Sequence, residues 1–248
     1  MAKFTDEEVE RYARHLVLRE VGGAGQQALK AARVLIVGAG GLGAPAALYL
    51  AAAGVGTLGL ADADTVSLSN LQRQVLYAAT DIGRLKVEAA ADHLAALNAN
   101  VVVRAHPLML DAAAAWDLVR DYDLVLDGTD NFETRFAVSD ACVAEGKILV
   151  SGAIGRWTGQ VGVFKGQPCY RCLVSEAPPD AETCVAVGVV GALAGVIGSM
   201  MALEAIKLIT GAGQALTGRL LIYDGLAGET RTVRIGADPH CPRCGAGA

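Results

Sequence analysis

The sequence predicts an α/β fold built on one mixed sheet, parallel in its first half and antiparallel at its end, with flanking helices. Three observations support this expectation. Apolar strand patterns alternate with helical patterns between Arg33 and Ser151, as in right-handed βαβ units. A glycine-rich turn follows the first of these strands. After Gly155, strand patterns recur, and glycines punctuate the last pair.

The predicted elements divide a single domain, residues 1–248, into three parts. Residues 1–32 form an arm that is helical over 5–32, with a glycine break at Gly22, Gly23 and Gly25. Residues 33–155 form the parallel half, with strands over 33–37, 57–62, 101–105, 123–127 and 148–151 and helices over 41–53, 84–97, 111–119 and 134–145. Residues 156–248 form the antiparallel half, with strands over 160–164, 219–223 and 230–235. We expect one continuous sheet.

Composition excludes several classes of protein. Hydrophobic residues make up 53% of the chain and charged residues 19%, which indicates a compact globular protein. The net charge of −5 argues against a nucleic-acid binder, which is more often basic. The first 19 residues carry charges and lack the apolar core of a signal peptide, so a cytoplasmic protein is expected. In that compartment the six cysteines are expected to be ligands or catalysts rather than disulfides.

One uncharged stretch, Val185 to Leu203, is long enough to reach across a bilayer. We expect instead a helix buried in a soluble fold, because Glu204 and Lys207 follow at once and no basic flank is present. Small residues recur every three or four positions along it and predict a close approach to another backbone: Gly188, Gly191, Gly195, Gly198 and Ala202.

The turn after the first strand has the spacing of a phosphate-binding loop, with Gly38, Gly40 and Gly43 ahead of an alanine-rich helix. Backbone N–H groups at a helix N-terminus attract anions, and glycine lets a phosphate approach closely. Asp62 ends the next strand, where a carboxylate can hold ribose hydroxyls. These features fit NAD and ATP equally well.

Cations downstream of Asp62 favour a more highly charged ligand. Asn70, Gln72 and Arg73 follow closely, and Arg84 and Lys86 stand at the start of the next helix. Three cations at the sheet edge where ligands bind would suit a triphosphate.

The segment after the strand ending at Asp127 adds acidic and amide groups at the same edge, namely Asp127, Asp130 and Asn131. A carboxylate beside phosphates needs an intervening cation, so Asp130 is a candidate Mg²⁺ contact. The alternative is that Asp127 or Asp130 caps the following helix.

Two C-x₂-C pairs, Cys169/Cys172 and Cys241/Cys244, predict a closed tetrahedral Zn²⁺ site, which is structural because no position remains for water. A redox dithiol would not explain two pairs. Of the other two cysteines, Cys142 is expected in the core. Cys184 precedes a predicted helix, which would favour its thiolate, but an unreactive loop thiol is equally compatible with the sequence.

Together these motifs resemble the MoeB/ThiF family, the bacterial relatives of ubiquitin-activating enzymes. The resemblance covers essentially the whole chain and rests on "RYARHLVLREVGGAGQQALKAARVLIVGAGGLG", "DADTVSLSNLQRQ", "DIGRLKVEAA", "DGTDNFETR", "CYRC", "GVIGSMMALEAIK" and "CPRC". It implies an ATP-dependent adenylyltransferase acting on the C-terminal Gly-Gly tail of a small ubiquitin-like sulfur carrier, of the MoaD or ThiS type. Such carriers serve molybdopterin biosynthesis, thiamine biosynthesis and other sulfur-carrier routes, and the sequence does not choose among them.

The resemblance also implies roles for single residues and an assembly. Gly41 would lie against the nucleotide, Asp62 on ribose, Asp130 on Mg²⁺, and Asn70, Arg73 and Lys86 on phosphates. Family members are homodimers, in which Arg14 reaches the neighbouring active site. Cys184 matches a cysteine that bonds covalently to the carrier in some members. No rhodanese-like segment follows Cys244, so a separate sulfur donor is expected.

This chain departs from the family pattern at two places in the late helix. Gly191 and Met201 stand where the family often has proline and glutamine. Two other functions stay open. An NAD-dependent oxidoreductase could use the glycine loop, but Arg73 and Lys86 would then be idle. A non-catalytic zinc protein that binds a partner would leave the whole phosphate site unexplained.

Overall fold

The computed structural model describes residues 4–178 and 188–245. Eight strands form its sheet: β1 (Arg33–Val37), β2 (Thr57–Ala61), β3 (Val102–His106), β4 (Leu124–Asp127), β5 (Ile148–Gly155), β6 (Thr158–Lys165), β7 (Arg219–Asp224) and β8 (Glu229–Arg234). The α-helices are α1 (Asp6–Arg11), α2 (Ala13–Leu16), α3 (Gly22–Ala31), α4 (Gly43–Ala52), α5 (Lys86–Leu97), α6 (Ala112–Val119), α7 (Phe132–Ala144), α8 (Tyr170–Leu173) and α10 (Gly191–Thr210). Two short 3-10 turns, η1 (Leu68–Asn70) and η2 (Ala79–Asp81), lie between β2 and α5.

The predicted mixed sheet is confirmed. Its strand order is β3-β2-β1-β4-β5-β6-β7-β8, in one sheet. Every pairing from β3 to β5 is parallel, and every pairing from β5 to β8 is antiparallel. Because β2 and β4 flank β1, the strand order reverses at β1, and ligands bind in the crevice that such a reversal opens.

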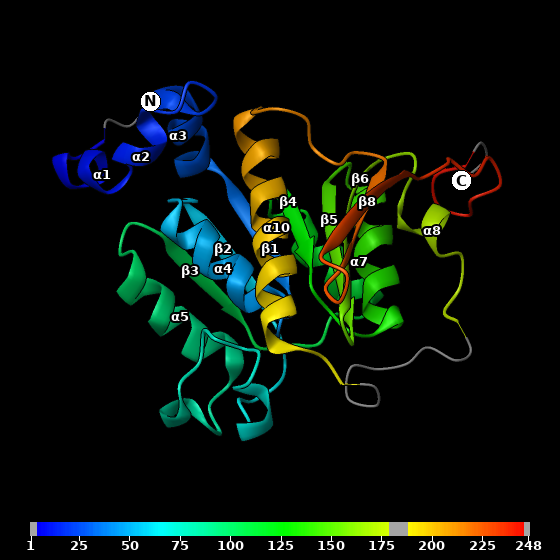
Figure 1. Ribbon diagram of the computed structural model, residues 1–248, viewed down its shortest axis with the longest axis horizontal. Coiled ribbons are helices and arrows are strands. Elements are labelled where there is room, and N and C mark those ends of the chain that lie inside the picture. Colours follow the sequence, from blue (N-terminus) through cyan, green and yellow to red (C-terminus); the bar gives the residue numbers. More distant parts are fainter. Residues whose placement is uncertain (1–3, 179–187, 246–248) are drawn as a thin grey trace.

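Alternate residues of the central strands pack into two different cores, as the period of a strand requires. Ile36 and Leu126 face a core shared with α4, α5 and α10, and Leu35 and Val125 face a core shared with α6 and α7. Figure 1 shows α10 running across the first of these faces. Cys142 is buried in the second core, as predicted.

Helix α10 forms the centre of the first layer. By length and composition it could cross a membrane, and it is the one such helix among residues 4–178 and 188–245. It packs against α4, α3, β5 and β6. The predicted small-residue approach is real at Gly198, where an added Cβ would collide with Pro45 and the Leu42 carbonyl, but Gly195 meets nothing within 4 Å.

The N-terminal arm differs from prediction in one detail. The helical arm is interrupted, but the break lies at 17–21, between α2 and α3. Gly22, with φ +55°, stands at its end, and Gly23 and Gly25 lie inside α3. A capping box between Thr5 and Glu8 starts α1. Tyr12 is 4% exposed and covers Gly54, where a Cβ would overlap the ring. The arm is therefore fixed to the end of the sheet at which β1 begins (Figure 1).

Candidate functional site

A cavity of about 410 Å³ opens at the C-terminal ends of β1, β2, β4 and β5, where the strand order reverses. Most of the residues that the sequence assigns to a nucleotide line it: Gly38, Gly40, Gly41, Asp62, Asn70, Arg73, Lys86, Asp130 and Asn131. The topology thus brings together groups from three separate connections, those that follow β1, β2 and β4. This location is the one that open α/β sheets use for ligands.

The glycine loop forms the floor of the cavity. Gly38 has φ +86°, a conformation that favours glycine, and α4 begins at Gly43. Gly43 does not line the cavity in this structure. An added Cβ there would overlap the Gly38 carbonyl oxygen, so Gly43 lets the loop fold tightly against its own helix. A direct nucleotide contact by Gly43 stays a prediction.

Asp62 is tied to the glycine loop. Its carboxylate accepts hydrogen bonds from the backbone N–H groups of Ala39 and Asp64, each at 2.8 Å. Burial raises the pKa of Asp62, and the positive charge of Lys86 works in the opposite direction. Lys86 is 5% exposed, and its Nζ lies 2.7 Å from Asp64 Oδ2. Asp64 was not predicted, although the alternation in "DAD" places it on the same side of the chain as Asp62.

The segment between β2 and α5 holds its polar groups with its own backbone. Asn70 Oδ1 accepts from the Ser67 N–H at 3.4 Å within η1, and Arg73 Nη1 donates to the Ser69 carbonyl at 3.1 Å. Gln74, also missed, is 3% exposed, and its Oε1 has no hydrogen-bond partner among the described residues. The prediction that Arg84 joins this cationic group is wrong, since it pairs with Asp81 and Asp92 outside the cavity.

Gly191, which departs from the family pattern, has a local explanation. An added Cβ at this position would overlap the backbone carbonyl oxygen of Gln72. The first turn of α10 therefore presses directly on the segment that carries Arg73. Met201, the second position that differs from the family pattern, is fully buried. Its Sδ packs so closely on Gly152 that a Cβ added there would overlap it.

The loop after β4 combines a buried carboxylate with an exposed one. Asp127 is 0% exposed and pairs with Arg135 and Ser151, and Asp130 is exposed and lines the cavity. The alternative that an aspartate caps α7 is wrong, because Asn131 is the N-cap and accepts from the Thr134 N–H at 2.8 Å. Arg135 and Ser151 were not predicted. Single-sequence patterns give no signal that such distant residues meet.

An apolar wall completes the cavity. Leu108, Met109 and Leu110, which precede α6, and Phe132, at the start of α7, line it. Met109 is 63% exposed, so its side chain is accessible to a ligand in the cavity. The cavity therefore offers one apolar wall for a flat base beside a polar floor for phosphates.

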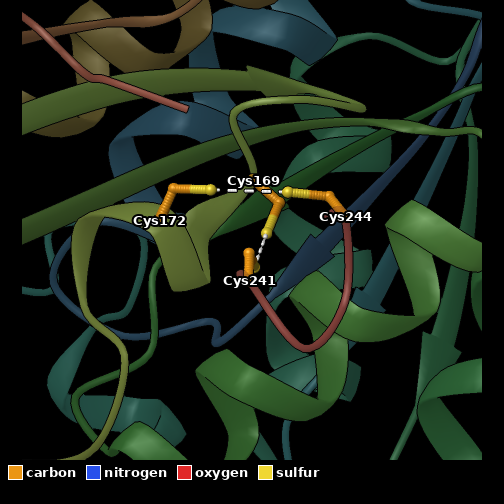
Figure 2. Close-up of side chains that lie close together, drawn as sticks. All are labelled: Cys169, Cys172, Cys241 and Cys244. Atoms are coloured by element: carbon orange, nitrogen blue, oxygen red, sulfur yellow. Dashed lines mark hydrogen bonds between the residues drawn. The ribbon is translucent and has the colours of Figure 1, made fainter. Parts of the chain in front are cut away.

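The four predicted cysteine ligands form one cluster (Figure 2). Their sulfur atoms all lie within 4.8 Å of one another, with Cys169 and Cys241 at 3.6 Å and Cys172 and Cys244 at 3.4 Å. A tetrahedral zinc with Zn–S bonds of about 2.3 Å needs sulfur atoms about 3.8 Å apart, so the cluster fits Zn²⁺. Burial raises the pKa of Cys241, but backbone N–H groups of Arg243 and Cys244 bring it down to about 7.

Two predicted residues lie elsewhere. Arg14 is exposed on α2, which packs on α3 at the end of the sheet opposite the cavity. It does not line the cavity of its own chain. Cys184 lies outside the described residues, so its role stays a prediction.

The chain is similar to known proteins over almost its whole length. The model of the ThiF family matches residues 12–244. A probable adenylyltransferase/sulfurtransferase, MoeZ, of Mycobacterium tuberculosis is 51% identical over 245 residues, which cover 96% of this chain and 62% of the relative. The chain thus spans less than two thirds of that relative.

Two further relatives match along most of their own length. The sulfur carrier protein adenylyltransferase of Thermus thermophilus is 47% identical over 252 residues, covering 98% of this chain and 93% of the relative. The molybdopterin-synthase adenylyltransferase of Escherichia coli is 46% identical over 248 residues, covering 99% of this chain and 100% of the relative. No match named here is to an oxidoreductase.

Proposed function

Because the chain belongs to the ThiF family, we propose that it uses ATP to adenylylate the C-terminal glycine carboxylate of a small ubiquitin-like sulfur-carrier protein. One observation carries the proposal. A single cavity joins a glycine loop, Arg73 and Lys86 to the first residues of the antiparallel half. That cavity has groups for a triphosphate, and residues of β5 and β6, Ala153, Ile154 and Gln160, also line it. The names of the Thermus and Escherichia relatives support this activity.

The proposed reaction needs no general base. A C-terminal carboxylate has a pKa near 3.5, so it is ionised at pH 7 and can attack the α-phosphorus directly. A carboxylate–phosphorus bond forms, the bond to the β-phosphate bridging oxygen breaks, and pyrophosphate leaves with its electron pair. The obstacle is repulsion, about 4 kcal/mol for unit charges ~4 Å apart at an effective dielectric of ~20. Arg73 and Lys86 would offset it and stabilise the charge that develops on the leaving group.

Asp130 would hold Mg²⁺, which when bound supplies further neutralisation of the phosphate charge. The chemistry of the donors supports this assignment, since Asp130 presents an exposed carboxylate to the cavity next to Asn131. Asp62 would orient the ribose by accepting hydrogen bonds from its hydroxyls, since each carboxylate oxygen accepts one backbone N–H and keeps a second lone pair. The four cysteines would hold one structural Zn²⁺, and four thiolates leave no site for a catalytic water.

We propose that the working unit is a homodimer in which Arg14 acts on the partner's cavity. Two observations support it. Tyr12 anchors the arm, so Arg14 projects from a fixed position far from its own cavity. Large apolar side chains are also exposed on the outer layer, namely Tyr49 at 58%, Val196 at 37% and Leu203 at 56%. A second copy would cover them.

The remaining assignments complete the proposal. The carrier would end in Gly-Gly, and a separate protein would supply the sulfur. The pathway would be molybdopterin synthesis, thiamine synthesis or another sulfur-carrier route. Neither nucleic acid nor a membrane would be a partner, and the enzyme would work in the cytoplasm. Cys184 would be either a covalent acceptor for the carrier or a dispensable thiol, and a Cys184→Ser variant separates the two.

Pyrophosphate exchange tests the proposal. Purified protein with ATP, Mg²⁺ and a Gly-Gly-ended carrier should move labelled pyrophosphate into ATP. Arg73→Ala and Asp130→Ala should each abolish exchange, and Arg33→Ala is the matched control because Arg33 lies on the surface at the opposite end of the sheet. If no Gly-Gly-ended carrier supports pyrophosphate exchange and the protein binds NAD tightly, the oxidoreductase is favoured instead. Mixing Arg14→Ala and Asp130→Ala subunits should restore activity if sites are shared.

A further inference from the structure

A buried ionic network lies directly beneath the cavity. It joins Asp127 at the end of β4, Arg135 on α7 and Ser151 on β5, which are 0%, 6% and 5% exposed. Arg135 Nη1 donates to Ser151 Oγ at 3.1 Å and to Asp127 Oδ2 at 3.4 Å. The Ser151 hydroxyl donates in turn to Asp127 Oδ2 at 2.9 Å. Three consecutive elements, β4, α7 and β5, are thus joined by one carboxylate and one guanidinium.

This network grips the residue that precedes Asp130. Thr129 donates to Asp127 Oδ1 with both its backbone N–H, at 3.0 Å, and its hydroxyl, at 2.7 Å. Arg135 Nη2 donates to the Thr129 carbonyl and, at 2.8 Å, to the Gly152 carbonyl. Every polar group of Thr129 is therefore engaged. On the other side of Asp130, Asn131 caps α7, so the loop is held at both ends.

A structural need alone explains this arrangement poorly. Removing two charges from water costs several kcal/mol, and an apolar cluster of the same volume often stabilises a fold more. Both faces of the sheet around the network are apolar and well packed. Burial lowers the pKa of Arg135, but the charge of Asp127 raises it above its ordinary value, so the guanidinium stays charged. The guanidinium donates several hydrogen bonds in fixed directions and therefore holds a loop in one geometry. Apolar contacts have no such directionality.

We propose that Arg135 is a positioning residue for Asp130: with Asp127 and Ser151 it holds the Thr129–Asp130 loop in the geometry that receives the metal-bound nucleotide. The inference rests on the proposed function, because it takes Asp130 as the metal contact. Arg135 also lines the cavity, but its guanidinium is engaged by Asp127, by Ser151 and by two backbone carbonyls. It acts through the backbone of Thr129, and the carboxylate of Asp130 keeps its place without a side-chain contact of its own to Arg135.

Hydrogen exchange tests the loop without any activity. In the full chain, Arg135→Met should speed exchange of the Thr129 amide at least about tenfold, because a hydrogen-bonded charged group is lost. The Gly128 amide, which donates to the Val37 carbonyl at 2.9 Å, is the reference within the same loop and should change much less. Arg33→Met, at the surface pair with Asp123 at the other end of β4, is the control variant and should change neither amide.

Metal binding tests the consequence. Mn²⁺ replaces Mg²⁺ together with a non-hydrolysable ATP analogue, and its paramagnetic signal measures the Mn²⁺ affinity of the wild type. That affinity should fall about tenfold in Arg135→Met and by less in Arg135→Lys. In pyrophosphate exchange, the Mg²⁺ concentration for half-maximal rate should rise by the same factor. Excess Mg²⁺ should restore much of the rate.

Each result decides something. Faster Thr129 exchange with weaker Mn²⁺ binding supports the proposal. A folded Arg135→Met variant with unchanged metal binding overturns it, as does a lower turnover at unchanged metal affinity, which would make Arg135 act on the reaction directly. If Arg135→Met does not fold, Ser151→Ala removes one contact without stranding a charge, and unchanged metal binding there overturns the proposal. A wild type that binds no Mn²⁺ with nucleotide refutes the proposed function instead, whatever Thr129 does.

Discussion

The two halves of this sheet are held together in different ways. In the parallel half, β4 is buried along its whole length, between one core on each face. In the antiparallel half, every residue of β8 is exposed. The chain around it is fixed at points: the four cysteines, and Arg171 and Arg243, which pair with Asp140 on α7 at 2.8 and 3.0 Å. Apolar burial on both faces therefore stabilises β4, whereas β8 contributes no residue to either core and depends on the point contacts around it.

The largest change in the free energy of unfolding should come from shortening a buried side chain of β4. Leu126→Ala removes a fully buried side chain from β4 and should lower the free energy of unfolding by about 2–5 kcal/mol. Val233→Ala, the matched change in β8 at a side chain that is 40% exposed, should cost less than about 0.5 kcal/mol. Urea denaturation measures both. Similar losses at the two positions would refute the contrast.

Metal removal should produce the opposite pattern. Cys241→Ser, or a chelator, should release about one zinc per chain and raise amide exchange at least about tenfold in α8 and in 236–245, while β1 and β4 keep their protection. Cys142→Ala is the control, because that thiol is buried in the core and outside the cluster. Metal analysis that finds no zinc in the wild type removes the four-cysteine assignment.

A third prediction concerns the point where α10 presses on the cavity. Gly191→Ala should displace the Gln72 backbone and with it Arg73, raising the KM for ATP about tenfold, the cost of about one lost charged hydrogen bond. Gly195→Ala on the same helix is the control, since nothing lies within 4 Å of its added Cβ. That variant should be stabilised by about 0.5–1 kcal/mol. An unchanged KM in Gly191→Ala would mean that this contact does not set the position of Arg73.

The smallest effect should come from a surface pair at the other end of the parallel strands. Asp123 accepts from the Arg33 backbone N–H at 2.8 Å. Burial raises the pKa of Asp123, but bonds and charge from Arg33 bring it below its ordinary value. Stability from this pair is therefore present above about pH 4, the unfolded pKa, and is lost as pH falls through the lower folded pKa.

The test is Asp123→Asn, measured by urea denaturation at pH 7 and at pH 2.5. Both partners are about half exposed, so solvent screens the pair and the loss at pH 7 should stay below about 1 kcal/mol. The difference from wild type should shrink at the lower pH. A difference independent of pH would show that the Asp123 charge contributes nothing.

Most of the fold follows from local patterns, and the corrections come from contacts that local patterns do not encode. Apolar runs bounded by polar residues mark the predicted strands 33–37 and 123–127, and the structure has strands there, with the second beginning one residue later. The glycines at 22–25 suggested a break, and the structure has it just before them, at 17–21. Packing of α3 against α10 keeps Gly23 and Gly25 helical despite the low helix propensity of glycine.

The residues of the candidate site also fall into two groups, those that local motifs predict and those that they do not. Loop residues such as Asp62, Arg73 and Lys86 were predictable because motif and topology place them at one sheet edge. Arg84 is the instructive failure. Its spacing matched the cationic group, but Asp81 and Asp92 offer it nearer partners. The network of Arg135 with Ser151 could not be predicted, because a buried pairing between a helix and a neighbouring strand leaves no periodic trace.

The terminal strands of the sheet also bear on solubility. Within the described residues, β3 and β8 end the strand order, so each presents one row of backbone groups that no strand of this sheet covers. Such rows template aggregation unless charged side chains discourage a second chain from pairing. Arg104 lies on β3, and Arg231 and Arg234 lie on β8. The molecule can therefore leave its last strand fully open to water and still avoid becoming a nucleus for intermolecular sheets.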